Sequence, residues 1–117
     1  MERYQISLEA ENLPNTGRYF RTISPYAVVE IVEGPHRGQS LGETEPIVRS
    51  RNPDWVKIFF IDARPDIVVK FQISIWDYRG PNKEPTKIGE LREPLEVISV
   101  YNSRGNIVAE RIGDNGT

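Results

Sequence analysis

The sequence predicts an all-β domain, an antiparallel sandwich or barrel of about eight short strands. Val and Ile together account for 23 of the 117 residues, whereas Leu and Ala account for only 9. Branching at Cβ suits a pleated strand better than a helix. Nine Pro and nine Gly are spread through the chain, and no stretch of a dozen residues keeps the apolar spacing of an amphipathic helix.

Four strands are predicted in the first half of the chain. The first alternates apolar and polar side chains, as a half-buried strand does. The second is almost continuously apolar, which indicates burial on both faces. The third contains Pro46, which restricts that part of it to a sheet edge or a bulge. Between the second and third lies a glycine-rich connection. We expect these strands at residues 4–10, 26–32, 43–49 and 55–61.

The second half shows the clearest alternation, with four apolar side chains separated by polar ones over residues 69–75. A long polar loop follows over residues 77–87. Two further strands are expected at residues 88–97, with a break near Pro94, and at residues 107–112. Strands this short and this closely spaced are typical of a sandwich or barrel.

Size and composition limit the domain count and the function classes. A chain of 13.4 kDa is expected to form one domain over residues 1–112, with a frayed tail at 113–117. A net charge of −2 gives no general attraction to nucleic acid. No apolar run reaches the length of a membrane span, and the N-terminus lacks a signal-peptide pattern, so a cytoplasmic location is expected.

Three groups of residues, in order along the chain, resemble one known family, the C2 domains. Their order and spacing match that family from about residue 3 to residue 100. The middle group, Thr44-Glu45 with 52–57, is also similar to the copine branch of that family. The groups are Leu13-Pro14 with Ser24-Pro25-Tyr26-Ala27-Val28-Val29, then Thr44-Glu45 with Asn52-Pro53-Asp54-Trp55 and Phe59, then Ile73-Ser74-Ile75-Trp76-Asp77-Tyr78 with Ile88-Gly89-Glu90.

The resemblance implies an eight-stranded antiparallel Greek-key β-sandwich with three loops gathered at one end. It also implies binding of phospholipid membranes or protein partners, in many members through two or three calcium ions, and no catalysis by the domain itself.

Most of the calcium ligands that the resemblance implies are missing. The family usually supplies five aspartates, and calcium needs six to eight oxygen ligands. Asp77 is retained, but Ser24, Arg18 and Arg79 stand at other ligand positions, and Glu84 is the only acid near the last one. We therefore expect no metal site and no cofactor; Asp77 and Glu84 are the remnant candidates for a single weak ion. An alternative role for Asp77 is to accept hydrogen bonds within its loop.

Basic residues replace the acids in these loops. If the loops gather at one end, a positive surface could attract anionic lipid without calcium. Tyr19 and Phe20, between two arginines, could insert at headgroup level. Ordinary solvated loops, with aromatic residues folded back on the core, are the alternative. The predicted lipid-binding residues are Arg18, Tyr19, Phe20, Arg21, Arg51, Arg79, Lys83 and Lys87.

A second lipid site of the family, a lysine-rich stretch on the third and fourth strands, is in doubt here. Glu43 and Glu45 stand where lysines are expected, although Lys57 and Lys70 could share that face. Trp55 and Trp76 are expected to be core aromatics rather than ligand platforms.

An enzyme is the least favoured class. The chain has no cysteine and one histidine, His36, in a glycine-rich connection, and it has no phosphate-binding or metalloprotease motif. The favoured function is a calcium-independent recruitment module for anionic membranes, monomeric and part of a larger chain. A protein-interaction module, weak calcium-dependent lipid binding and a purely structural domain remain alternatives.

Overall fold

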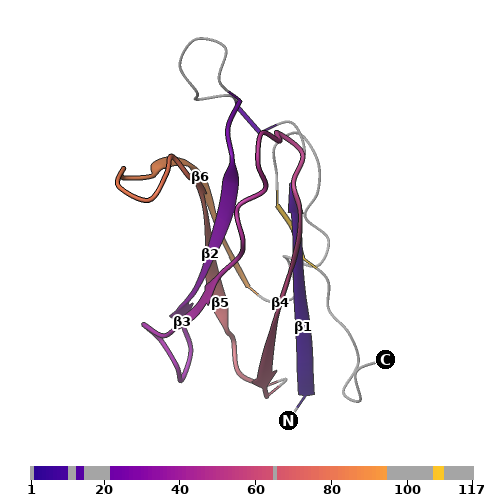
Figure 1. Cartoon of the computed structure of the whole chain (residues 1–117). Helices are drawn as coiled ribbons and strands as arrows, with labels where there is room; N and C mark the ends of the chain where they lie inside the picture. The colour runs from indigo at the N-terminus through magenta and orange to yellow at the C-terminus, as the bar shows by residue number, and fades with distance from the viewer. Residues whose placement is uncertain (1, 11–12, 15–21, 65, 95–106, 110–117) are drawn as a thin grey trace.

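The computed structural model describes residues 2–10, 13–14, 22–64, 66–94 and 107–109. Their strands form two facing sheets (Figure 1), one with the order β4-β1-β7 and the other with the order β3-β2-β5-β6. All strand pairs are antiparallel, which confirms the predicted sandwich. The strands are β1 (Glu2–Ala10), β2 (Pro25–Glu33), β3 (Ser40–Glu43), β4 (Asp54–Ala63), β5 (Lys70–Asp77), β6 (Thr86–Pro94) and β7 (Ile107–Ala109).

The structure describes seven strands, against about eight predicted, and residues 95–106 and 110–117 lie outside its described part. The predicted strand at 107–112 is described as far as Ala109, and the predicted tail at 113–117 lies beyond the described residues. The expected break near Pro94 coincides with the end of β6.

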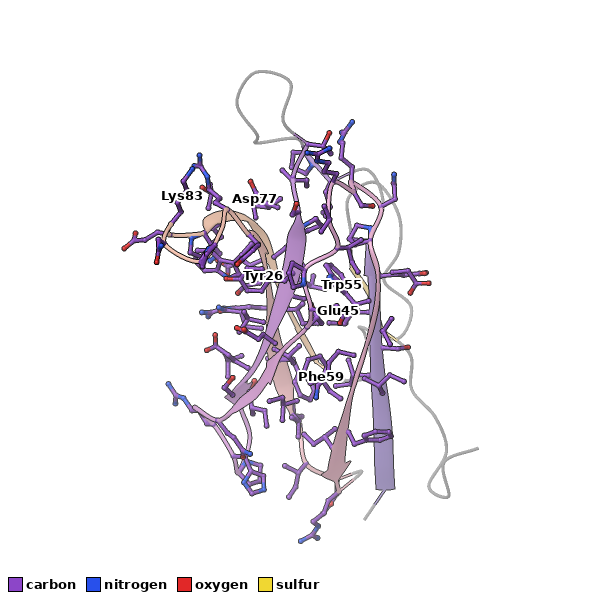
Figure 2. All side chains as sticks on the ribbon, viewed as in Figure 1. Tyr26, Glu45, Trp55, Phe59, Asp77 and Lys83 are labelled. Atoms are coloured by element: carbon purple, nitrogen blue, oxygen red, sulfur yellow. The ribbon has the colours of Figure 1, made fainter. Side chains whose placement is uncertain are left out.

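The core lies between the two sheets. In β2 and β5 the side chains that point inward are fully buried, among them Val29 and Phe71 at 0% exposure. Trp55 and Phe59 face them from β4 (Figure 2). The prediction that β2 is buried on both faces is wrong, because buried and half-buried residues alternate along it. Its outer face includes the half-buried Glu30, as expected for a sheet with one face toward solvent.

The third strand is shorter and begins earlier than predicted, at residues 40–43 instead of 43–49. Pro46 has no N–H to donate to a ladder, and Arg49 has a φ of 52°, which a strand does not accommodate. Beyond β3, a side chain takes part in the pairing with β2. The Thr44 N–H donates to the Ala27 carbonyl and the Ala27 N–H to Thr44 Oγ1, each at 2.8 Å.

The motif from Thr44 to Lys57 connects the two sheets. The Glu45 carboxylate accepts the backbone N–H groups of Val56 at 2.6 Å and Lys57 at 3.2 Å. They lie where the register between β1 and β4 shifts. The Trp55 indole N–H donates to the Pro25 carbonyl at 3.1 Å. Glu45 and Trp55 therefore join the start of β4 to the sheet that contains β2.

Three connections leave the sandwich at one end. Pro25 lies opposite Asp77, Asp77 lies opposite Thr86, and on the other sheet Glu9 lies opposite Asp54. The β1–β2, β3–β4 and β5–β6 connections therefore share an end, which we call the loop end. The β2–β3 and β4–β5 turns lie at the opposite end (Figure 1).

We predict that Glu45→Gln destabilises the fold in a pH-dependent way. Burial on its own raises the pKa of the Glu45 carboxyl, but hydrogen bonds from the Val56 and Lys57 N–H groups outweigh burial and lower that pKa. A carboxyl with a lowered pKa stabilises the fold above its unfolded-state pKa, and this contribution is lost as the pH falls through the folded-state value. Urea unfolding at pH 7 should show a loss of up to about 1 kcal/mol.

The difference from the wild type should shrink as the pH falls below 4.5, the ordinary value of this carboxyl. Glu43→Gln is the matched control, since its carboxylate accepts no backbone N–H among the described residues. Equal losses in both variants, or a loss that does not change with pH, would contradict this role of Glu45.

Candidate functional site

Residues 23–25 are the point at which the loop end is held together. The Ser24 N–H donates to Asp77 Oδ1 at 2.9 Å, and the Tyr78 N–H donates to the Ser24 carbonyl at 2.9 Å. From the β3–β4 connection, the Arg49 N–H donates to Ser24 Oγ at 3.1 Å. Ser24 therefore binds both neighbouring connections, through its backbone and its side chain.

Further hydrogen bonds extend this link on both sides. The Ser50 N–H donates to the Ile23 carbonyl and the Ile47 N–H to the Pro25 carbonyl, each at 3.0 Å. The β3–β4 connection is also joined to the chain just after β1, because Arg51 Nε donates to the Leu13 carbonyl at 2.6 Å. The described parts of all three connections are therefore fixed by direct hydrogen bonds.

Asp77 is a structural acceptor in this arrangement. It is only 2% exposed, and its side chain lies beside the start of β2 (Figure 2). A carboxylate that accepts a backbone N–H is held in one orientation and has fewer lone pairs for a metal. The alternative interpretation of Asp77, as a hydrogen-bond acceptor within the loops, agrees with this geometry.

The described residues of the loop end do not fit a calcium site. Nowhere in the described ranges do three His, Cys, Asp or Glu side chains gather so as to hold a metal ion. Calcium requires six to eight oxygens, whereas Asp77 is engaged with Ser24, and Glu84 lies exposed on the β5–β6 connection. Between Asn12 and Ser24 the sequence contains no acidic residue.

Exposed cations lie on two connections of the loop end. Arg51 is on the β3–β4 connection, and Arg79 and Lys83 are on the β5–β6 connection. Arg79 makes a long contact, 3.5 Å from Nη1 to Thr86 Oγ1. Arg49, which is not among the predicted lipid-binding residues, is also exposed on the β3–β4 connection.

Lys87 differs from these cations, because an acid and a ring lie beside it. Its ammonium is 2.6 Å from Glu90 Oε1 and 5.8 Å from the centre of the Trp76 ring. The hydrogen bond and charge of Lys87 lower the pKa of Glu90. Trp76 is only half-buried on the outer face of β5, so of the two predicted core tryptophans only Trp55, at 3% exposure, is a core residue.

Val48 is an apolar residue at this end that is not among the predicted site residues. Its side chain is 71% exposed, whereas its neighbour Ile47 packs against the core. Because a strand is predicted over residues 43–49, Val48 is assigned to that strand and not to a loop. The adjacent Asn52-Pro53 turn and Pro46 are the available signals that this segment is a loop.

The other predicted residues are partly outside the described ranges. Arg18, Tyr19, Phe20 and Arg21 lie outside them, so their role stays a prediction. Lys57 and Lys70 belong to different sheets, and Lys70 is 3.4 Å from Glu33. His36 is exposed in the β2–β3 turn.

Comparisons with known proteins point to one family. The C2-domain family model matches residues 5–108. The structure of BON1-C2B is similar over 95% of this chain and 90% of its own length, with 17% identity and a TM-score of 0.70. A C2 domain of plant extended synaptotagmin 1 is similar over 94% of each chain, with 15% identity and a TM-score of 0.63.

Human GIVD cytosolic phospholipase A2 is also similar, with 15% identity and a TM-score of 0.67. The match covers 95% of this chain but only 17% of the phospholipase chain. No curated protein sequence matches. At these identities the solved structures establish the fold alone. None of the described residues belongs to a helix long and apolar enough to cross a membrane.

We predict that Asp77→Ala lowers the free energy of unfolding by about 2 kcal/mol, because the buried Ser24 N–H loses its acceptor. Ser24→Ala should cost about 1 kcal/mol, since it removes the acceptor of the Arg49 N–H. Urea denaturation measures both. Glu84→Ala, an exposed acid on the same connection as Asp77, is the control and should change stability by less than about 0.5 kcal/mol. A loss for Asp77→Ala as small as the control's would show that Asp77 does not hold the loop end.

Proposed function

This chain belongs to the C2-domain family, and we propose that it is a non-catalytic module that recruits its protein to anionic phospholipid membranes without calcium. C2 domains are a family of lipid- and calcium-binding modules, and the family model covers residues 5–108 of this chain. The observation that carries the proposal is the 71% exposed Val48 on a loop end with exposed cations on two connections.

In the proposed mechanism the loop end approaches the membrane surface. Arg49, Arg51, Arg79 and Lys83 attract anionic headgroups, while Val48 enters the interfacial region. Exposed acids of the same end, among them Glu9, Asp54 and Glu84, reduce this attraction in part. The candidates outside the described ranges, Arg18, Tyr19, Phe20 and Arg21, would add to it, and the paired Lys87 would contribute less.

The strength of this attraction can be estimated. Each basic residue near an anionic surface contributes about 1 kcal/mol, and burying one valine contributes about 1.5 kcal/mol at most. Four cations and Val48 thus supply roughly 5 kcal/mol, which corresponds to a dissociation constant of about 0.2 mM. Such weak docking suits a module that acts beside a second membrane contact in a longer chain. We accordingly propose a peripheral location at a cytoplasmic membrane face, with the domain itself a monomer.

Calcium independence is supported by the chemistry of the loop end. In the described residues the one retained acid, Asp77, is buried and bound to Ser24, and side-chain cations already supply positive charge. No metal is then needed to give this end the sign that anionic lipid requires.

A protein-interaction module is the second candidate, and a different surface favours it. On the outer face of β4, Val56, Ile58 and Phe60 are 81%, 38% and 57% exposed. Alternate strand residues share one face, so these three side chains form an apolar stripe of the kind that protein interfaces use. The stripe starts beside the loop end and extends along β4 toward the β4–β5 turn.

We predict that the chain co-sediments with phosphatidylserine vesicles equally with calcium and with chelator. Raising the salt concentration should weaken this binding steeply, because screening shortens the Debye length from about 10 Å at 0.1 M to about 3 Å at 1 M. Binding only with calcium would contradict our interpretation of Ser24 and Asp77. Absence of binding would favour the protein-interaction module over membrane docking.

We predict that reversing charges at the loop end weakens binding, whereas reversals at the opposite end do not. Arg49→Glu with Arg79→Glu should reduce vesicle binding at least tenfold, since each reversal replaces an attraction of about 1 kcal/mol by a repulsion. The matched control is Arg37→Glu with Arg64→Glu, which changes the net charge equally at the β2–β3 and β4–β5 turns. Equal losses in the two double variants would indicate attraction to net charge rather than a docking surface.

We predict that Val48→Asp weakens vesicle binding about tenfold, because it removes an apolar contact and adds a repelled charge. Val68→Asp is the control, since Val68 is 56% exposed near the opposite end. Val56→Asp should leave vesicle binding unchanged. A loss with Val56→Asp but none with Val48→Asp would move the contact to the β4 stripe.

A further inference from the structure

A groove lies beside the loop end, between the chain leaving β3 and the β5–β6 connection. Its volume is about 440 Å³, which is within the range of ligand-binding clefts. Its lining includes Tyr26 of β2, Pro46 on one side and Tyr78, Pro81 and Pro85 on the other. Two tyrosines and three prolines thus line one concave surface.

The groove is formed before any ligand arrives. On one wall, Thr44 is joined to Ala27 by two hydrogen bonds of 2.8 Å. On the other, Gly80 has a φ of 121°, which favours glycine, and its carbonyl accepts the Lys83 N–H at 3.3 Å. Proline rings fix φ as well. A ligand would therefore bind here with little ordering cost to the protein.

Tyrosine and proline side chains are the lining that an extended proline-rich segment fits. A polyproline II helix has no internal hydrogen bonds, so its carbonyls remain available to donors such as tyrosine hydroxyls. Its prolines pack on aromatic faces, as in other domains that recognise such segments. Tyr26 is half-buried and Tyr78 is 41% exposed, so each presents part of its surface.

Opposite charges at the groove select the ligand further. Glu43 lies on the β3 side and Lys83 on the β5–β6 side, with Lys83 at the outer part of its connection (Figure 2). Both are exposed, and within the described ranges Glu43 has no ion-pair partner. Burial raises the pKa of Tyr26, and the charge of Glu43 raises it further, so Tyr26 keeps its hydroxyl proton beside this carboxylate.

We propose that this groove binds a proline-rich protein segment in the polyproline II conformation, with a basic residue at Glu43 and an acidic group at Lys83. The apolar lining provides contact area, and the two charges set the direction of the chain. This interaction goes beyond membrane docking and uses a different surface, with Lys83 common to both.

The test is an amide NMR titration of the full chain with the peptide acetyl-Arg-Ala-Pro-Pro-Leu-Pro-Pro-Ala-Glu-amide. A second titration uses the same peptide with its arginine and glutamate exchanged. Shifts should be concentrated at residues 26, 43–44, 78–80 and 83–84. A peptide with every proline replaced by alanine should bind at least tenfold more weakly. Phosphocholine and inositol phosphates are titrated separately as headgroup probes.

A double-mutant comparison assigns the charge contact. Replacing the peptide arginine by alanine should weaken binding about two- to fivefold for the wild type and have no effect for Glu43→Gln. Glu33→Gln, an exposed carboxylate at the other end of the same sheet, is the control and should behave as the wild type. Tyr78→Ala should abolish the shifts; if it fails to fold, the Glu43→Gln comparison still decides.

Three outcomes would overturn the proposal. They are no shifts at the groove with millimolar peptide, equal shifts with the proline-free peptide, and groove shifts with the headgroup probes alone. The last result would identify a lipid headgroup as the occupant. None of the three depends on vesicle binding, so failure of this inference and failure of membrane docking are distinguishable.

Discussion

The loop end depends on one hydrogen-bonded residue, Ser24, which lies between the buried Ile23 and Pro25 at the start of β2. Its N–H, carbonyl and hydroxyl each bond to another connection, reaching Asp77, Tyr78 and Arg49. Such bonds are short-ranged and directional, so they fix where the connections leave the sandwich. The positions of the exposed side chains beyond them follow from this constraint. A metal ion can join loops only where the chain supplies its ligands. The hydrogen bonds of Ser24 join the connections without a metal.

The alternation of apolar residues is sufficient to predict the sandwich and most of its strands, because burial of one sheet face imposes a period of two. The alternation does not predict strand bounds where a side chain, instead of the backbone, makes the hydrogen bonds to the neighbouring strand. After β3 the chain stays beside β2 through Thr44 Oγ1, and the left-handed φ of Arg49 leaves no periodic signal. Asp77 can be identified from the sequence, but its partner cannot, because a backbone N–H has no sequence signature. Val48 is missed because the segment after β3 has no periodic pattern that marks it as a loop.

The proposed docking mechanism is physically connected with the burial of Asp77 and its hydrogen bond from Ser24. A loop end with acids must first bind a cation before it can approach an anionic surface, since like charges repel. Here the positive charge belongs to side chains whose connections are already fixed. The proposed surface is therefore preorganised, and its weak attraction depends mainly on ionic strength and lipid charge. The groove beside it is fixed by the same hydrogen-bonded segments, with prolines in its walls.

The hydrogen bonds of Glu45 also affect how this protein meets other copies of itself. Within the described residues β4 is an edge of its sheet, and it carries Val56, Ile58 and Phe60 exposed on its outer face. A long apolar edge strand offers unpaired N–H groups to a strand of another molecule, the usual start of aggregation. The Glu45 carboxylate occupies the N–H groups of Val56 and Lys57 and places a negative charge beside them. This residue therefore leaves fewer free N–H groups on the edge at the point where the apolar stripe begins, which is one of the ways in which an edge strand is made a poorer template for another chain.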